Sequence, residues 1–199
     1  MGNKDKKEAV IIAGANGSGK TTFARKFLEL TQYEFLNADE IAKQLNPEDP
    51  LKARIAAGKK VINSIDELIK AGKSFVIEST LAGSFLEKHI TKLKERGYEI
   101  KLIFLYLGST ELCMNRIKSR VMQGGHDVPD EDVIRRFNRG LVKFWDQYSW
   151  MVDNFSLYYN NEIYDFKLVG KGQKNQFEVV NEPLFEEFIL KVEELRNER

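Results

Sequence analysis

The chain has little of several features that mark whole classes of protein. Its single cysteine, Cys113, lies in an apolar helical pattern and cannot form an intramolecular disulfide, which favours a reducing, cytoplasmic setting. Lys and Arg number 31 against 30 Asp and Glu, so the net charge of +1 argues against a uniformly basic nucleic-acid surface. No apolar run reaches the length that crosses a membrane, and no signal peptide is recognisable. We therefore expect no membrane attachment and no nucleic-acid partner.

A phosphate-binding motif stands near the start of the chain. Residues 14–21 read Gly-Ala-Asn-Gly-Ser-Gly-Lys-Thr, the pattern G-x-x-x-x-G-K-S/T, between a strand-like run at 9–13 and a helix-forming stretch at 22–30. Glycines let the backbone N–H groups turn toward phosphate oxygens, and the helix adds the positive end of its dipole. We expect Lys20 to reach the β- and γ-phosphates of ATP and the Thr21 hydroxyl to bind Mg²⁺. The expected nucleotide contacts of this loop are Gly14, Ala15, Asn16, Gly17, Ser18, Gly19, Lys20, Thr21 and Thr22.

Strand-like and helix-like segments alternate after this motif. Strands are predicted at residues 33–37, 74–78, 100–107 and 155–159, and helices at 40–45, 51–71, 85–96, 110–123 and 129–147. The end of the chain is predicted to hold strands at 163–169 and 177–180, a loop at 170–172 and a helix at 183–196. Runs such as 102–105 are apolar on both faces, as a parallel sheet covered by helices requires. The pattern predicts one domain over residues 1–199, with 1–8 as a frayed tail.

The predicted architecture is a three-layer α/β P-loop NTPase fold with a mostly parallel sheet and flanking helices. An ABC ATPase would carry a Leu-Ser-Gly-Gly-Gln-type signature, and a GTPase an Asn-Lys-x-Asp motif on a late strand. This sequence has neither at those places. The small-kinase type remains, in which an arginine-bearing lid closes over the phosphates.

Arginines near the middle of the chain support this class independently. Arg116 and Arg120 lie one turn apart on the predicted helix 110–123, with no acidic residue three or four positions away. Stacked like charges repel, so an anion is expected beside them. The Gly-Gly-His-Asp-Val-Pro segment at 124–129 would form the hinge of the lid.

The next predicted helix carries three more arginines. Arg135 and Arg136 each have an acidic residue four positions earlier, so an ion-paired solvent face explains them as well as a phosphate site does. Arg139 has no such neighbour and is the better phosphate candidate.

Polar residues at the ends of two predicted strands are candidates for the acceptor side of the site. Asp39, just after Asn37, is placed to accept the proton of an attacking hydroxyl, or alternatively to cap the helix 40–45. Glu78 could hold Mg²⁺ through water, bind substrate hydroxyls, or pair with a lid arginine. Ser79 and Thr80 could donate to substrate oxygens or cap the next helix. We expect Asn37, Glu78 and Thr80 to contact the substrate.

Other residues carry weaker signals. His126 in the lid segment could contact phosphate or substrate, or make backbone hydrogen bonds within its turn. The aromatic residues between 144 and 150 are spaced for core packing rather than base stacking. Tyr158, Asn160 and Asn161 come at the end of the last core strand, near where related kinases hold adenine, and the sequence does not say which of them touches it.

These motifs together resemble the zeta toxin family, and most closely its stand-alone branch of P-loop kinases. The resemblance rests on residues 37–42, 75–83 and 124–129, with the phosphate loop and Arg135-Arg136. It implies a kinase-like fold in which ATP phosphorylates a hydroxyl of UDP-N-acetylglucosamine, with the possibility of an antitoxin partner. By motif position it implies the following roles: Asp39 as the base, Lys20 as the phosphate clamp, Glu78 as a substrate or metal contact, and Arg120 and Arg136 as lid cations.

Three functions are consistent with the sequence. The first is Mg·ATP-dependent phosphorylation of a small-molecule hydroxyl, with a nucleotide-sugar as the expected acceptor. The second is an ATP-binding regulatory protein, or a toxin–antitoxin component that acts by interaction without small-molecule kinase activity. The third, polynucleotide 5′-kinase activity, would call for a basic channel that the balanced charge does not suggest.

Overall fold

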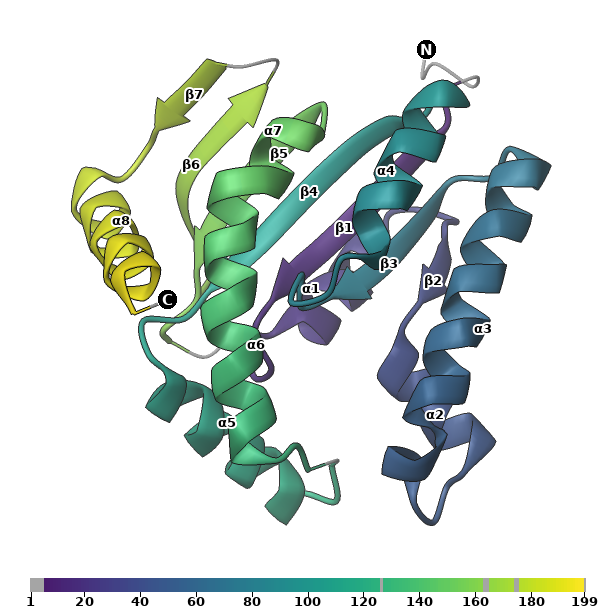
Figure 1. The fold of residues 1–199 in the computed structure, drawn as a ribbon, viewed down its shortest axis with the longest axis horizontal. Helices are drawn as coiled ribbons and strands as arrows, with labels where there is room; N and C mark the ends of the chain where they lie inside the picture. The colour runs from purple at the N-terminus through teal and green to yellow at the C-terminus, as the bar shows by residue number, and fades with distance from the viewer. Residues whose placement is uncertain (1–5, 126, 163–164, 174–175, 199) are drawn as a thin grey trace.

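The computed structural model describes residues 6–125, 127–162, 165–173 and 176–198. Helices and strands alternate along the chain as far as the fifth strand, and two more strands and a last helix follow (Figure 1). The strands are β1 (Glu8–Gly14), β2 (Glu34–Leu36), β3 (Phe75–Ser79), β4 (Glu99–Tyr106), β5 (Asn154–Tyr159), β6 (Lys167–Gln173) and β7 (Gln176–Val179). The helices are α1 (Lys20–Leu28), α2 (Ala38–Leu45), α3 (Pro50–Ala71), α4 (Phe85–Glu95), α5 (Thr110–Met122), α6 (Asp130–Lys143), α7 (Ser149–Met151) and α8 (Glu182–Asn197).

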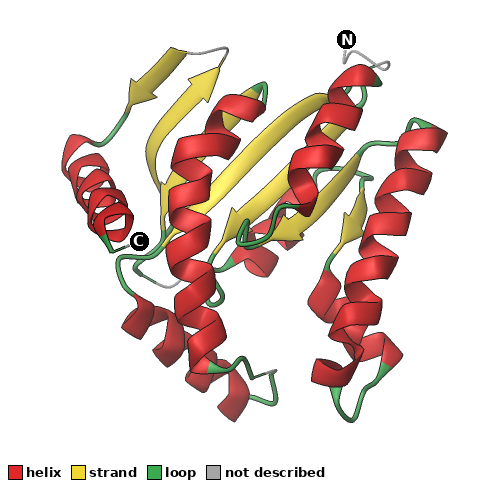
Figure 2. Ribbon diagram, viewed as in Figure 1, coloured by secondary structure: helices red, strands yellow, loops and turns green. Residues whose placement is uncertain are grey.

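The seven strands form one sheet in the order β2-β3-β1-β4-β5-β6-β7. The first five in this order are parallel, whereas β6 and β7 are antiparallel to their neighbours. Helices α4 and α6 cover the near face of the sheet in Figures 1 and 2, and α1 lies behind it. The predicted α/β fold with a mostly parallel sheet is therefore confirmed.

Side chains along β1 show why both faces of the sheet are covered. Ile11 belongs to the larger core cluster, which includes residues of α3 to α6 and α8. Its neighbours Val10 and Ile12 point the other way and pack with Ala24 of α1. Because the carboxyl ends of parallel strands meet at one edge, the phosphate loop after β1 and the residues that end β3 lie close together there.

The end of the sheet differs from the sequence-based expectation. Residues 170–172, predicted as a loop, lie inside β6. Gly170 and Gly172 belong there because the rings of Phe177 and Phe155 pack directly over them, where a Cβ would collide. Of the strand predicted at 163–169, Ile163 and Tyr164 lie outside the described residues.

The start of the chain also differs in part. Residues 1–5 of the predicted tail lie outside the described residues. Residues 6–8, however, are attached to the sheet: Glu8 begins β1, the Glu99 N–H donates to the Lys7 carbonyl, and Lys6 pairs with Glu99 at 2.8 Å. That part of the prediction was wrong because β4 extends far enough to bind the segment.

The helix predicted at 129–147 is interrupted. After α6, residues Phe144–Tyr148 form a π-helical turn, which places both of these aromatic side chains in the core with no exposed surface. Core packing of the aromatic segment is thus confirmed, with Trp150 as its exposed exception. None of the helices in the described residues combines the length and the hydrophobicity that a membrane span requires.

Candidate nucleotide-binding and phosphotransfer site

The phosphate loop joins β1 to α1 in the conformation that the motif predicts. Gly19, in a left-handed conformation (φ 90°), precedes the first turn of α1 and leaves its N–H groups facing the loop. Gly17 (φ 81°) lies so close to α5 that a Cβ would be 2.9 Å from the Cys113 carbonyl oxygen. The glycines are therefore required both by backbone conformation and by close packing.

Two carbonyl groups of this loop are held by side chains from outside it. Asn160, which follows β5, donates from Nδ2 to the Ser18 carbonyl at 2.8 Å. Arg116 of α5 donates to the Gly17 carbonyl at 3.4 Å and to the Asn161 carbonyl at 2.9 Å. Outward carbonyls leave the N–H groups turned inward, as phosphate binding requires. Arg116 thus reaches the loop, and Asn160 and Asn161 adjoin it, whereas their expected place near the adenine stays a prediction.

Two buried polar atoms support the fit of this loop to a nucleotide. In the described part of the chain, the buried side-chain nitrogen and oxygen atoms without a hydrogen-bond partner are Ser18 Oγ and Asn160 Oδ1. Both adjoin the phosphate loop. Buried polar groups are nearly always satisfied in folded proteins, so unsatisfied ones concentrated at one place indicate a ligand site.

Lys20 lies folded across the loop. Its Nζ donates to the Ala15 carbonyl at 2.9 Å and lies 3.8 Å from Glu78 Oε1. The side chain is 7% exposed, and burial lowers the pKa of Lys20, against which the nearby charges of Glu78 and Asp39 act. A phosphate bound in the loop would stabilise the charged form of the Lys20 ammonium group and so oppose the lowering of its pKa.

Glu78 connects the end of β3 to the phosphate loop. Its Oε2 accepts from the Thr21 hydroxyl at 2.9 Å and from Asn37 Nδ2 at 2.8 Å. Burial raises the pKa of Glu78, while Lys20 and Thr21 counteract that shift. The alternative that Glu78 pairs with a lid arginine is wrong, because its cation is the phosphate-loop lysine.

The same pair of oxygens fits a magnesium ion. A hydroxyl and a carboxylate 2.9 Å apart beside the phosphate loop are hard oxygen donors. Mg²⁺ is usually held by one or two such protein groups, with water and substrate phosphates completing its shell. No group of three or more His, Cys, Asp or Glu side chains in the described ranges makes a protein-only metal cage.

Asn37 rather than Asp39 caps α2. The Asn37 Oδ1 accepts from the backbone N–H groups of Asp39 and Glu40, at 2.8 and 3.1 Å. Asn37 is buried, and both polar atoms of its side chain are thereby occupied, one by the helix and one by Glu78. It therefore positions Glu78 relative to the start of α2. The capping alternative for Asp39 is wrong, and its carboxylate in the first turn of α2 is exposed.

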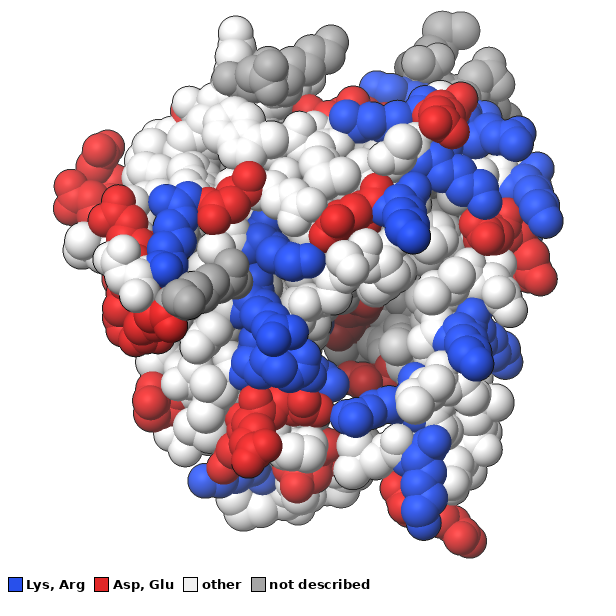
Figure 3. Space-filling view, in the orientation of Figure 1, with Lys and Arg blue, Asp and Glu red and all other residues white. Residues whose placement is uncertain are grey.

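These residues surround one cavity of about 350 Å³. Lys20, Asp39, Glu78 and Thr80 all line it, together with residues of α3 and α6. Figure 3 shows the molecule hollowed between α6 and α3, with acidic side chains inside and basic ones at the rim. The volume lies in the range of small-molecule sites.

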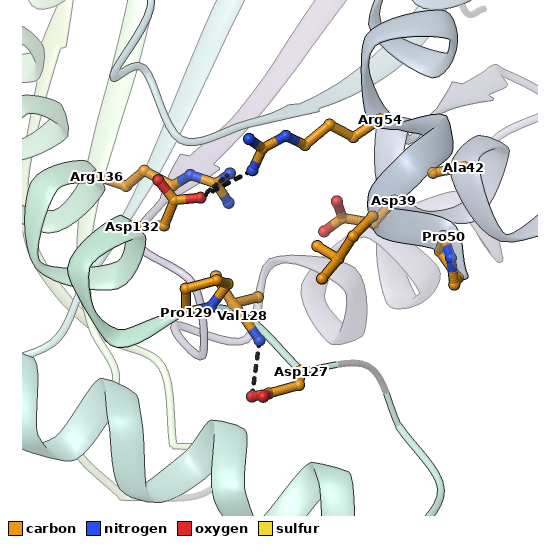
Figure 4. A pocket seen from close by; sticks show the side chains of 10 residues that line it. Asp39, Ala42, Pro50, Arg54, Asp127, Val128, Pro129, Asp132 and Arg136 are labelled. Carbon is orange, nitrogen blue, oxygen red and sulfur yellow. Dashed lines mark hydrogen bonds and ion pairs between the residues drawn. The ribbon is translucent and has the colours of Figure 1, made fainter. Parts of the chain in front are cut away.

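Arginines from two helices converge at the rim on one carboxylate. Asp132 of α6 accepts from Arg135 at 2.6 Å, from Arg54 of α3 at 3.0 Å and from Arg136 at 3.4 Å. Arg136 also donates to Asn16 Oδ1 of the phosphate loop at 3.2 Å. Figure 4 shows the guanidinium groups of Arg54, from α3, and Arg136, from α6, both reaching the Asp132 carboxylate, with the Asp39 carboxylate facing the same gap. All three arginines line the cavity.

The remaining predicted residues have different placements. Arg120, in the last turn of α5, is exposed, and its positive charge contributes to lowering the pKa of Lys20. Arg139 is exposed and does not line the cavity. His126 lies outside the described residues. Thr22 lies in the first turn of α1.

The loop after β3 is strained. Ser79 Oγ accepts from the Leu81 N–H at 3.1 Å, so this hydroxyl closes a local turn instead of capping α4. Leu81 has φ 56°, the left-handed region that a bulky residue seldom adopts, and its side chain is buried. Such strain often marks functional loops.

Sequence reasoning did not find Arg54 and treated Arg135 as a pair with Glu131. Arg54 stands near the start of a long helix with no motif around it, so its contact with residue 132 cannot be seen in a linear pattern. The missed signal for Arg135 is Asp132, three positions earlier. Residues three apart lie on the same face of a helix, just as residues four apart do.

Comparison with known proteins shows the family of the chain. A family model described as an AAA domain matches residues 10–142. The chain belongs to this family. An uncharacterized protein of Haemophilus influenzae is 35% identical over 130 residues, which cover 65% of this chain and 92% of that protein.

Two solved structures are similar in fold. The AvrRxo1-ORF1:-ORF2 structure with ATP matches with a TM-score of 0.76 and 17% identity, over 94% of this chain and 64% of that one. This chain therefore spans less than two thirds of the AvrRxo1 chain. A chain of the PezAT chromosomal toxin–antitoxin system of Streptococcus pneumoniae matches with a TM-score of 0.64 and 17% identity, over 98% and 88% of the two chains. The fold is that of a P-loop kinase-like domain.

Proposed function

We propose that this chain is an ATP-dependent phosphotransferase that phosphorylates a hydroxyl of a small molecule. The observation that carries the proposal is that Lys20, at the start of α1, and Asp39, at the start of α2, line the same cavity. A carboxylate facing a phosphate-binding lysine across a cavity is the arrangement in which a base can take the proton of an attacking hydroxyl.

The roles of the nucleotide side follow from the contacts. Lys20 and the N-terminus of α1 would hold the β- and γ-phosphates, and Arg116 and Asn160 would keep the loop in shape. Thr21 and Glu78 would hold Mg²⁺, which when bound supplies positive charge between the phosphates. Arg120 and Arg136 would stabilise the charge that develops on the migrating group.

The acceptor in this proposal is a nucleotide-sugar such as UDP-N-acetylglucosamine. Support comes from the motif resemblance to zeta toxins and from the size of the cavity. Three guanidinium groups against one carboxylate also leave positive charge on the rim, which suits an anionic molecule. Similarity to PezAT, a toxin–antitoxin system, extends the proposal to a protein partner that would neutralise the enzyme.

The test is transfer from γ-labelled ATP with Mg²⁺ to a panel of nucleotide-sugars, nucleosides, sugars and oligonucleotides. A labelled small-molecule product that depends on both Asp39 and Lys20 is expected. Labelled oligonucleotide would instead establish a polynucleotide kinase. ATP binding with no labelled product on any acceptor would refute the proposal in favour of a nucleotide-dependent binding protein.

A further inference from the structure

Asp132 pairs with three arginines, whereas a single ion pair within its own helix would involve one. Its side chain is 18% exposed and lies between Arg54, Arg135 and Arg136. The pKa of Asp132 is held below its ordinary range, first by the hydrogen bond from Arg135 and then by the charges of the other two arginines. The carboxylate therefore stays ionised.

The contact with Arg54 joins two helices that are far apart in the chain. Arg54 stands on α3 and Asp132 on α6, 78 positions later. These helices stand on either side of the hollow in Figure 3, and Figure 4 shows the two side chains meeting there. The Arg54–Asp132 pair thus spans the rim of the cavity.

The contact with Arg136 connects Asp132 to the phosphate loop. Arg136 donates from Nη2 to Asp132 and from Nη1 to Asn16 Oδ1. A guanidinium held at both ends has one orientation, with its charge beside the phosphate loop. Without the carboxylate, Arg136 would lose one of its two anchors.

We infer that Asp132 is a positioning residue that aims Arg136 at the phosphate loop and, through Arg54, ties α3 to α6 across the rim of the cavity. In this arrangement the carboxylate sets the width of the cavity entrance before any substrate arrives. The consequence for catalysis rests on the proposed function, whereas the link between the helices does not.

The link is tested without any activity, by measuring the distance between α3 and α6 with paired spin labels. Ile55→Cys and Ile134→Cys supply the attachment points, because Ile55 and Ile134 are exposed and adjoin the arginines. The native Cys113 is buried, and burial raises its pKa to about 12, so it does not take up label. Asp132→Asn is compared with Glu131→Gln, an exposed neighbour that undergoes the same charge change.

A single narrow distance distribution is expected in the otherwise native protein, and a broader, longer one in Asp132→Asn. Arg54→Gln should reproduce that shift, and it serves as the second variant should Asp132→Asn fail to fold. Glu131→Gln should leave the distribution unchanged. An unchanged distribution in both Asp132→Asn and Arg54→Gln, or an equal shift in Glu131→Gln, would overturn the inference.

The catalytic part is read from kinetics once an acceptor is known. Asp132→Asn should lower kcat about tenfold, a size typical of a lost supporting contact, with little change in the KM for ATP. Asp132→Glu should recover part of kcat. If the native protein itself transfers no phosphate to any acceptor, the proposed function is refuted. The distance measurement alone then decides the role of Asp132.

Discussion

The Thr21 hydroxyl donates to Glu78 Oε2 across 57 positions of the chain, and the two oxygens are 2.9 Å apart. This hydrogen bond joins the first helix to the end of β3. Asn37 adds a second donor to the same oxygen from the cap of α2. The nucleotide side and the acceptor side of the site therefore meet at one carboxylate.

Glu78→Gln should weaken the binding of Mg²⁺ more than any other property. The amide oxygen can still accept from Thr21 and Asn37, but the negative charge beside the metal position is lost. We expect the Mg²⁺ concentration for half-maximal transfer to rise about 10- to 100-fold. A magnesium titration of activity measures this, with Glu87→Gln on α4 as the control. An unchanged titration would remove Glu78 from the metal site.

Asp39→Asn should abolish transfer without abolishing nucleotide binding. The amide cannot take a proton from the acceptor, so a fall of about 10²- to 10⁴-fold in kcat is expected. ATP affinity, measured by calorimetry, should stay within about threefold because, among the described residues, the Asp39 side chain makes no hydrogen bond or ion pair with the phosphate loop and acts on Lys20 only through its charge. Glu40→Gln, the next residue of the same helix turn, controls for the charge change. Full activity of Asp39→Asn would refute its role as the base.

Asn160→Leu should weaken ATP binding. The variant keeps the size of the side chain but lacks the donor that holds the Ser18 carbonyl. Loss of a buried hydrogen bond of this kind costs about 1–3 kcal/mol, so the Kd for ATP should rise about tenfold or more. Asn115→Leu, on an exposed position of α5, should leave the Kd unchanged. Equal affinities in both variants would show that the loop holds its shape without Asn160.

Gly140→Ala should destabilise the protein, because its methyl group would lie 2.3 Å from the Thr80 carbonyl oxygen. The helix α6 must then move away from the loop after β3. A cost of about 1–3 kcal/mol is expected, which lowers Tm by several degrees.

Gly58→Ala is the matched comparison for that variant. Among the described residues, leaving aside its chain neighbours and the backbone of its own helix, no atom lies within 4 Å of a Cβ at Gly58 of α3. The alanine should raise stability by about 0.5–1 kcal/mol, because glycine costs conformational entropy in a helix. Thermal unfolding of both variants decides the matter, and a stable Gly140→Ala would contradict the close approach of α6 to Thr80.

Cys113 should be inert in the native protein. Burial raises the pKa of its thiol from about 9 to about 12, so the folded state keeps the proton when the unfolded chain has lost it. This contribution to stability is present below pH 9 and is lost as the pH rises toward 12. The free energy of unfolding should therefore fall less steeply above pH 9 in Cys113→Ala than in the wild type. Rapid alkylation of the native thiol at pH 8 would contradict the prediction.

The sequence determined the parts of the site that are contiguous in the chain. The phosphate loop, with its glycines, Lys20 and Thr21, is one local segment, and its backbone conformation follows from residue type alone. The order of strands and helices was predictable for the same reason, since it rests on short-range apolar periodicity. Asp39 could be placed at the sheet edge because parallel strands all end there.

Tertiary structure decided which distant residues meet. Asn160 reaches Ser18 across 142 positions, and Arg54 reaches Asp132 across 78, so no spacing in the sequence announces either contact. That Asn37 rather than Asp39 caps α2 also needed three-dimensional structure, because either type of side chain suits a cap. A linear pattern reports what a residue can do, whereas the partner that it binds depends on how the helices pack around the sheet.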